Sequence, residues 1–162
     1  MIFLINSKKY GKYEVIIDDA DWDEVKKYKW HIAKQPKRKA VYARRNIYTK
    51  DCRSPFEMTL HKQLTGYKMT DHVNGNGLDC RRENMREATV SQNRHNTGIR
   101  TDNSSGYKGV SWDKSMNKWV AQIQVNCKGI KIGRFTTKEL AALAYNRAAI
   151  KYHGEFARLN EV

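Results

Sequence analysis

Acidic, imidazole and amide side chains are concentrated in one stretch of the sequence, from residue 71 to residue 96. Asp71 and His72 are adjacent, and a loop rich in glycine, asparagine and aspartate separates them from Asn84 and Asn93. A carboxylate with a neutral oxygen donor suits a hard cation such as Mg²⁺, which keeps most of its waters and takes few protein ligands. An imidazole titrates near neutral pH and can accept a proton from an attacking water. The stretch therefore carries the groups needed to hydrolyse a phosphodiester with a divalent cation.

The spacing of these residues resembles the HNH endonuclease motif, in the His-Asn-Asn form of phage and intron-homing enzymes. His72 matches its first position, Asn84 its central position and Asn93 its last. The resemblance implies a catalytic pair, in which His72 is the general base and Asn84 braces the loop. It also implies that Asp71 and Asn93 bind a catalytic Mg²⁺ or Mn²⁺. For Asp71, a turn-capping role is the structural alternative.

Two further histidines are candidate neighbours of this site. His95 follows closely after Asn93 and is the alternative metal ligand. His61 lies in a Leu-His-Lys-Gln-Leu segment, where a position near the substrate phosphate and a structural role are equally compatible with the sequence. Asp79 is expected to stabilise the loop as a hydrogen-bond acceptor and not to serve as a second metal ligand.

The charge of the chain indicates a polyanionic partner. The sequence has 31 Lys+Arg against 17 Asp+Glu in 162 residues, which gives a formal net charge of +14. Such an excess on a small chain favours nucleic acid, with binding that weakens as salt rises. Three arginines beside the catalytic stretch are candidates for contact with DNA phosphates, with a solvated role as the alternative: Arg81, Arg82 and Arg86.

Cysteine content and hydropathy limit the class of protein. Cys52, Cys80 and Cys127 are scattered and form no Cys-x-x-Cys pair, so no structural zinc is expected. They fit a reducing intracellular setting. No apolar run approaches the length of a membrane span, and the N-terminal residues do not resemble a signal peptide. The resemblance implies a phage or mobile-element gene acting in a bacterial cytoplasm.

The N-terminal part is expected to form a β-rich scaffold for the catalytic stretch. The pattern predicts a strand over 13–17, a short amphipathic helix over 22–30, and strands over 40–45 and 56–60. The basic run 37–39 is expected to form a solvated turn or to contact the DNA backbone. A helix is predicted to begin near Asn84 and to end near Asn96.

The composition changes after Asn96, where a small, polar segment over 97–106 reads as a linker. Strands are predicted over 107–112 and 118–125, followed by a hairpin turn at 126–129. A third strand with a bulge at Gly133 leads to a helix over 140–150, capped by Thr136 or Thr137. Apolar side chains alternate with polar ones along 118–125, so one face of this sheet is expected to be polar.

The C-terminal section is similar to the DNA-binding domain of the Apetala/ethylene-response-factor family. The matching segments include Tyr107-Lys108-Gly109-Val110, Lys118-Trp119-x-Ala121-x-Ile123 and Gly154-x-x-Ala157-x-Leu159-Asn160. The family lays its sheet in the major groove of DNA, which implies base or phosphate contacts from the polar sheet face. The residues at those positions are Lys108, Ser111, Gln122, Gln124 and Lys131. Plant members carry several arginines there, so target preference does not transfer.

Together these observations predict an α+β protein. A ββα-metal (His-Me finger) HNH nuclease domain is expected over 1–98, with its core over about 56–97. A linker over 99–105 and a DNA-binding domain over 106–162, with a small three-stranded antiparallel sheet and one helix, are expected to follow. The predicted function is metal-dependent cleavage of double-stranded DNA by a monomer or a homodimer. The alternative is a DNA-binding regulator or architectural protein with an inactive nuclease unit.

Overall fold

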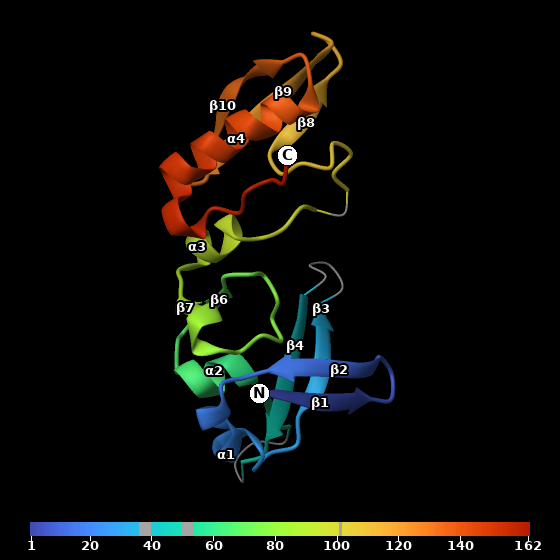
Figure 1. Ribbon diagram of the computed structural model, residues 1–162, viewed down its shortest axis with the longest axis vertical. Coiled ribbons are helices and arrows are strands. Elements are labelled where there is room, and N and C mark those ends of the chain that lie inside the picture. Colours follow the sequence, from blue (N-terminus) through green and yellow to red (C-terminus); the bar gives the residue numbers. More distant parts are fainter. Residues whose placement is uncertain (36–39, 50–53, 101) are drawn as a thin grey trace. The chain divides into compact units, whose positions relative to one another are not determined.

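Small antiparallel sheets and short helices make up both units into which the chain divides, Met1–Ala88 and Thr89–Val162 (Figure 1). The computed structural model describes residues 1–35, 40–49, 54–100 and 102–162. The basic run 37–39 and Cys52 lie outside the described residues. The α+β class expected from the sequence is confirmed.

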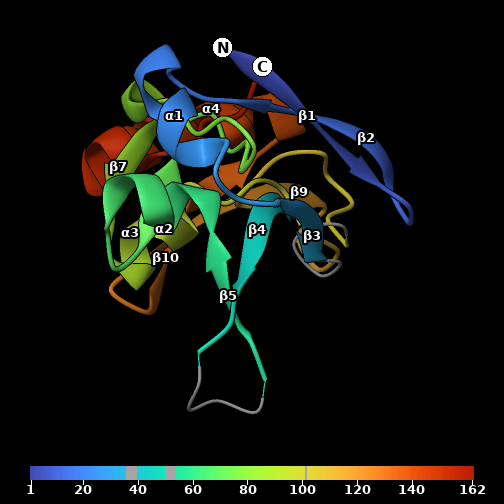
Figure 2. The ribbon, with the colours of Figure 1, turned by 90° about the horizontal axis from the view of Figure 1, so that it is seen from below.

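The first unit begins with a β-hairpin of β1 (Ile2–Ser7) and β2 (Gly11–Ile16). A separate antiparallel sheet has the order β3-β4-β5, with its strands side by side in Figure 2. These strands are β3 (His31–Gln35), β4 (Ala40–Ile47) and β5 (Phe56–Thr59). β1 was not among the predicted strands, because its apolar residues were compared only with a signal peptide.

Short helices connect these sheets to the catalytic stretch. α1 (Trp22–Val25) is a single turn, shorter than the predicted helix over 22–30. α2 (Leu60–Thr65) begins where β5 ends and stops at Gly66, whose φ of 71° is the left-handed conformation that closes a helix. A two-stranded sheet follows, made of β6 (Thr70–His72) and β7 (Met85–Glu87).

One apolar core holds the first unit together and reaches under the catalytic loop. The end of β2 pairs with that loop, because the Ile16 amide donates to the Leu78 carbonyl at 2.9 Å and the Cys80 amide donates to the Ile16 carbonyl at 2.7 Å. The β1–β2 hairpin therefore holds the loop between β6 and β7 through backbone hydrogen bonds. The buried core side chains are Ile5, Val15, Ile17, Val25, Ile32, Ala43, Leu60, Leu78, Cys80 and Met85.

The second unit begins with α3 (Val90–His95) and continues into a three-stranded sheet covered by one long helix. The sheet has the order β10-β9-β8, from β8 (Val110–Asp113), β9 (Lys118–Val125) and β10 (Lys128–Phe135). α4 (Lys138–His153) packs on all three strands (Figure 1). Small side chains at the contact let the helix approach the sheet closely, and the buried helix residues are Ala141, Ala142, Tyr145 and Ala149.

Local sequence explains the turns of this sheet. The hairpin between β9 and β10 turns at Asn126 and Cys127, whose φ angles are 49° and 63° as in a two-residue type I′ turn. The predicted bulge is present, because the pairing with β9 shifts register between Lys131 and Gly133. Thr137 caps α4 by accepting from the Leu140 amide at 3.2 Å.

Three boundaries differ from the sequence-based expectation. The predicted helix from Asn84 is interrupted by β7, and α3 starts only at Val90, after a capping box in which Thr89 and Gln92 exchange hydrogen bonds. The chain divides after Ala88, whereas the first domain was expected to end at residue 98. The first strand of the second sheet starts at Val110, because residues 107–109 form a turn with Gly109 at a φ of 74°.

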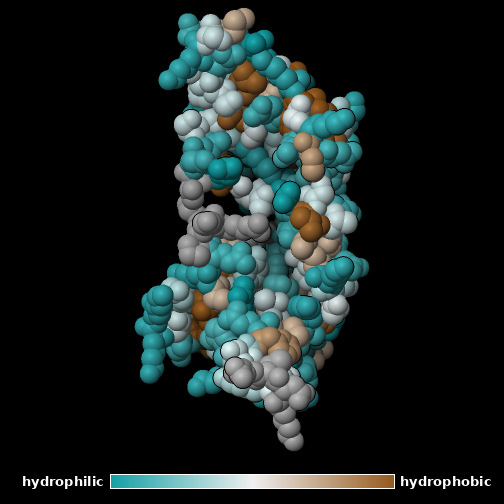
Figure 3. Space-filling view, turned by 180° about the vertical axis from the view of Figure 1, so that it is seen from behind, coloured by the Kyte–Doolittle hydropathy of each residue, from teal (hydrophilic) through white to brown (hydrophobic). Residues whose placement is uncertain are grey.

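The face drawn in Figure 3 is mostly polar, with apolar side chains in small groups. Within the ranges that the structure describes, no helix is long and apolar enough to cross a membrane.

Candidate active site and DNA-binding face

β6 and β7 place the Asp-His pair inside the first unit. Their ladder sets Asp71 opposite Arg86 and His72 opposite Met85. Asp71 and His72 are buried, with 3% and 6% of their surface exposed. Such burial of two titratable side chains in a short strand is uncommon unless each has polar partners.

Asn84 ties together the loop that joins the two strands. Its side-chain oxygen accepts from the Asn74 amide at 3.0 Å. Its amide nitrogen donates to the Asn74 side chain at 3.1 Å and to the Asp79 carbonyl at 2.8 Å. The Val73 amide also donates to the Asn84 carbonyl at 2.9 Å. These bonds close the loop across its base, which is the geometry expected of a loop-bracing asparagine.

Asp79 is a buried acceptor within the same loop. Its carboxylate accepts from the Arg81 guanidinium at 2.9 and 2.8 Å and from the Asn74 side chain at 2.9 Å. The ion pair with Arg81 holds the pKa of Asp79 below its ordinary value. Asp79 therefore stabilises the loop, in agreement with the sequence-based expectation.

The three arginines expected to meet DNA phosphates are engaged within the protein. Besides the pair of Arg81 with Asp79, Arg82 contacts the Asp21 carboxylate at 2.7 Å. Arg86 donates to Asp71 Oδ2 from Nε at 2.9 Å and from NH2 at 2.8 Å. The sequence could not show this, because two of the three carboxylates come from outside the local loop.

Two aromatic rings lie beside the imidazole of His72. The His61 ring lies 5.1 Å from it, edge to face, and the Tyr42 ring lies 6.2 Å from it. Tyr42 was not identified from the sequence, since nothing in a strand pattern signals a contact with residues so far along the chain. Burial lowers the pKa of His72, although the Asp71 and Asp79 charges act in the opposite direction. Burial and the neighbouring His72 lower the pKa of His61 to about 3.

The remaining motif residues belong to the second unit. Asn93 lies on α3, and the His95 side chain stacks on His153 of α4 with ring centroids 3.6 Å apart. His95 is therefore part of the packing of the second unit. Across the described ranges, no group of three or more His, Cys, Asp or Glu side chains is placed to hold a metal ion.

The sheet of the second unit presents the expected polar face. Ser111, Gln122, Gln124 and Lys131 are all exposed, and Gln122 pairs with Lys131 across the β9–β10 ladder. The apolar side chains Ala121 and Ile123 point to the buried side. The alternation predicted for β9 is thus confirmed, apart from Val120, which is also buried.

Lys108 differs from its expected position on that face. It precedes β8, and its ammonium donates to the backbone carbonyls of His95 at 2.5 Å and Thr97 at 2.6 Å. Burial lowers the pKa of Lys108 to about 8. We therefore correct its assignment from a DNA-contacting side chain to one that fastens α3 and the following segment.

Comparison with known proteins identifies the parts of the chain. The AP2 domain family model matches residues 105–155. An uncharacterized HNH endonuclease of Acanthamoeba polyphaga mimivirus is 30% identical over 146 residues, which cover 87% of this chain and 71% of the viral protein. The chain therefore belongs to the HNH endonuclease family, and it carries an AP2 domain.

Two further relatives match shorter parts. Protein 3.8 of Escherichia phage T7 is 33% identical over 88 residues, covering 54% of this chain and 72% of the phage protein. An ethylene-responsive transcription factor of Arabidopsis thaliana is 45% identical over 56 residues, covering 33% of this chain and 30% of the plant protein. No solved structure matches the chain.

Proposed function

We propose that this protein is a divalent-metal-dependent DNA endonuclease, with a cutting unit of the ββα-metal type and a DNA-reading AP2 domain. The observation that carries the proposal is the buried Asp71–His72 pair on β6, joined to β7 by a loop that Asn84 braces. α3 follows β7 in the chain and bears Asn93, so the order of elements is strand, loop, strand and helix. That order supports the ββα-metal assignment.

His72 is proposed as the general base. Its lowered pKa keeps the imidazole neutral at pH 7, which is the form that accepts a proton from water. The bonds of Asn84 hold the loop that begins immediately after His72, so they act on the position of the imidazole. Asn84 is thus proposed as a positioning residue.

Asp71 and Asn93 are proposed to hold the metal, Mg²⁺ or Mn²⁺. A carboxylate oxygen and an amide oxygen are hard donors of the kind these ions prefer, and Mg²⁺ uses only one or two protein carboxylates. When bound, the ion stabilises negative charge on the phosphate. The Arg86 guanidinium already pairs with the Asp71 carboxylate, so a metal ion bound to Asp71 would replace Arg86 as its positively charged partner.

Double-stranded DNA is the proposed substrate and partner. The AP2 domain, the net charge of +14 and the exposed polar face with Ser111, Gln122, Gln124 and Lys131 support it. Neutral amides suit base edges, and lysine suits guanine or phosphate. A monomer with one site nicks one strand, whereas a homodimer cuts both. A phage or mobile-element gene acting in a bacterial cytoplasm is proposed, and the relative from Escherichia phage T7 supports it.

One observation favours a second candidate, a DNA-binding regulator whose nuclease unit is inactive. The Asp71 carboxylate, proposed above as a metal ligand, is engaged by the Arg86 guanidinium at 2.8 Å. The two functions are separated by incubating purified protein with supercoiled plasmid and genomic DNA, with Mg²⁺ or with excess EDTA. The nuclease gives Mg²⁺-dependent cuts with 5′-phosphate and 3′-hydroxyl ends, mapped by sequencing. DNA binding without cuts supports the regulator.

A further inference from the structure

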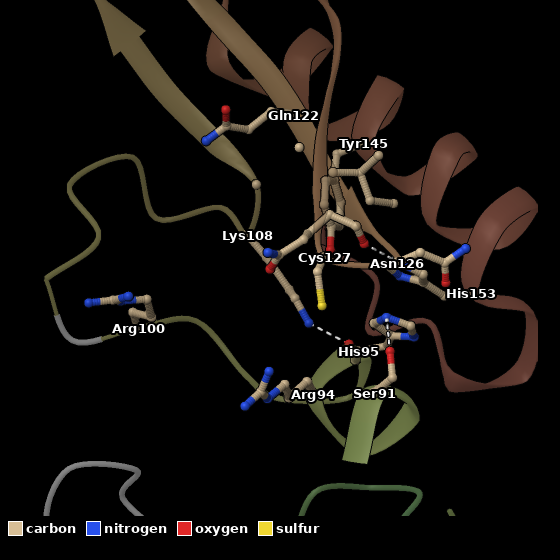
Figure 4. A pocket seen from close by; sticks show the side chains of 14 residues that line it. Ser91, Arg94, His95, Arg100, Lys108, Gln122, Asn126, Cys127, Tyr145 and His153 are labelled. Atoms are coloured by element: carbon tan, nitrogen blue, oxygen red, sulfur yellow. Dashed lines mark hydrogen bonds between the residues drawn. The ribbon is translucent and has the colours of Figure 1, made fainter. Parts of the chain in front are cut away.

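A hollow of about 490 Å³ lies entirely within the second unit (Figure 4). Its wall combines α3 and the segment after it with β9, the β9–β10 turn and α4. The polar residues that line it include Arg94, His95, Arg100, Lys108, Gln122 and Gln124. None of the described residues that line it is acidic. An acid-free concave surface with several cationic groups attracts an anion.

The segment from α3 to Arg100, which we call the basic arm, is fastened to the AP2 domain. The Lys108 ammonium donates to the carbonyl of His95, as drawn in Figure 4, and to that of Thr97. Lys108 therefore holds the arm at the end of α3. The His95 ring stacks on His153 with 7° between the ring planes. His153 in turn bonds through Nε2 to the Gln124 carbonyl at 3.0 Å. The arm is therefore held by Lys108, which precedes β8, and by His153 of α4.

The arm runs beside the polar face of the sheet. A second hollow of about 510 Å³ shares Arg100, Lys108 and Gln122 with the first, and Ser111 also lines it. Gln122 and Ser111 are thus neighbours of the arm. Any DNA that lies across these side chains passes close to Arg94 and Arg100.

The two arginines are available for an external anion. Arg94 is exposed and makes no ion pair with the residues that the structure describes. Arg100 pairs with Asp102, but the two side chains are 83% and 64% exposed, and a pair so open to water is weak and readily exchanged. Both arginines precede the residues that match the AP2 domain family model.

We propose that the basic arm is a DNA-backbone clamp, in which Arg94 and Arg100 contact phosphates beside the sequence read by Gln122 and Gln124. This proposal rests on the proposed DNA binding of the AP2 domain. It also accounts for how this domain binds DNA with neutral side chains at Ser111, Gln122 and Gln124. Lys108 is the positioning residue that holds the arm, and the arm adds positive charge beside the neutral side chains of the sheet.

The test measures binding of the full chain to a random-sequence duplex of about 30 base pairs by fluorescence anisotropy, without metal and across a range of salt. The variants are Arg94→Gln, Arg100→Gln and the double substitution, with Arg147→Gln on the exposed side of α4 as the matched control. Each lost phosphate contact should flatten the plot of log K against log salt by about 1. We expect the double variant to bind roughly tenfold or more weakly at moderate salt, with a slope reduced by about 2.

Each outcome decides the proposal. Restored binding and slope in Arg94→Lys/Arg100→Lys support a charge contact. A double variant that matches Arg147→Gln in affinity and slope overturns the clamp but leaves DNA binding intact. Weaker binding with an unchanged slope also overturns it. A substitution that only disturbs folding leaves the number of phosphate contacts, and so the salt slope, unchanged. If the unmodified chain does not bind DNA, the proposed DNA binding fails and the clamp fails with it.

Discussion

The rings of His61 and His72 lie 5.1 Å apart, edge to face, inside the first unit. Burial lowers the pKa of both imidazoles, and the neighbouring His72 lowers that of His61 further. This relationship links the proposed general base to the stability of the unit that carries it.

The protein should lose stability on acidification because of this pair. The folded-state pKa of His61 is about 3, against an ordinary value of 6.5, so the unfolded chain binds the proton more strongly. Stability is therefore complete above pH 6.5 and falls as pH decreases from 6.5 towards 3. From pH 7 to pH 5 the loss from His61 is roughly 2 kcal/mol, measured by urea unfolding. His61→Phe should reduce this loss, whereas replacement of the half-buried His31 by Gln should not. If the stability of His61→Phe depended on pH as that of the unmodified chain does, the loss could not be assigned to His61.

Asn84→Ala should destabilise the first unit. The substitution removes three side-chain hydrogen bonds and leaves the Asn74 amide and the Asp79 carbonyl without that partner. The expected cost is roughly 2–4 kcal/mol by denaturant unfolding. Asn76→Ala in the same loop removes one side-chain acceptor, which the Leu78 amide uses at 3.1 Å, at an exposed position, and should cost less than about 1 kcal/mol. Equal effects of the two substitutions would show that Asn84 does not brace the loop.

Gly109→Ala should destabilise the AP2 domain strongly. The φ of 74° disfavours any side chain, and a Cβ there would lie 2.2 Å from the ring of Tyr145 and 2.6 Å from the Gln122 carbonyl. We expect a loss of roughly 3 kcal/mol or more. Gly106→Ala is the control, because Gly106 has a similar φ of 78° but nothing within 4 Å of the added Cβ. The difference between the two isolates the steric contribution, and its absence would contradict the packing of α4 on the sheet.

Gln122→Ala and Gln124→Ala should relax sequence preference without changing the salt dependence of DNA binding. Both side chains are neutral, so their loss removes base contacts of roughly 1–3 kcal/mol each but no counterion release. Lys131→Gln should instead flatten the salt dependence by about 1. Selection of bound sequences from a random pool, followed by anisotropy, measures both quantities. An unchanged preference in both glutamine variants would assign base readout elsewhere.

Much of the second unit follows from its sequence. The alternation along β9 apart from Val120, the turn at Asn126, the bulge near Gly133 and the cap at Thr137 are local signals, and the structure shows each of them. What the sequence could not show is the use of Lys108. Its position in the motif suggests DNA contact, but its ammonium binds carbonyls of a segment outside the motif.

The fold of the first unit was less predictable, because pairing between strands that are distant in the sequence determines it. Residues Met85–Glu87 read as the start of a helix, yet they form β7, since pairing with β6 buries Met85 in the core. Local periodicity carries no information about that partner. The arginines near the motif likewise read as free cations, although Arg82 and Arg86 meet carboxylates brought close by folding.

The central claim is that His72 activates water for DNA cleavage, and plasmid nicking with Mg²⁺ tests it most directly. The substitution is His72→Ala, with His31→Ala at a histidine outside the proposed site as the control and circular dichroism to confirm that both variants fold. We predict Mg²⁺-dependent nicking by the unmodified chain and by His31→Ala, and a loss of roughly a hundredfold or more in His72→Ala, the size expected of a general base. Nicking by His72→Ala at the unmodified rate would contradict the account.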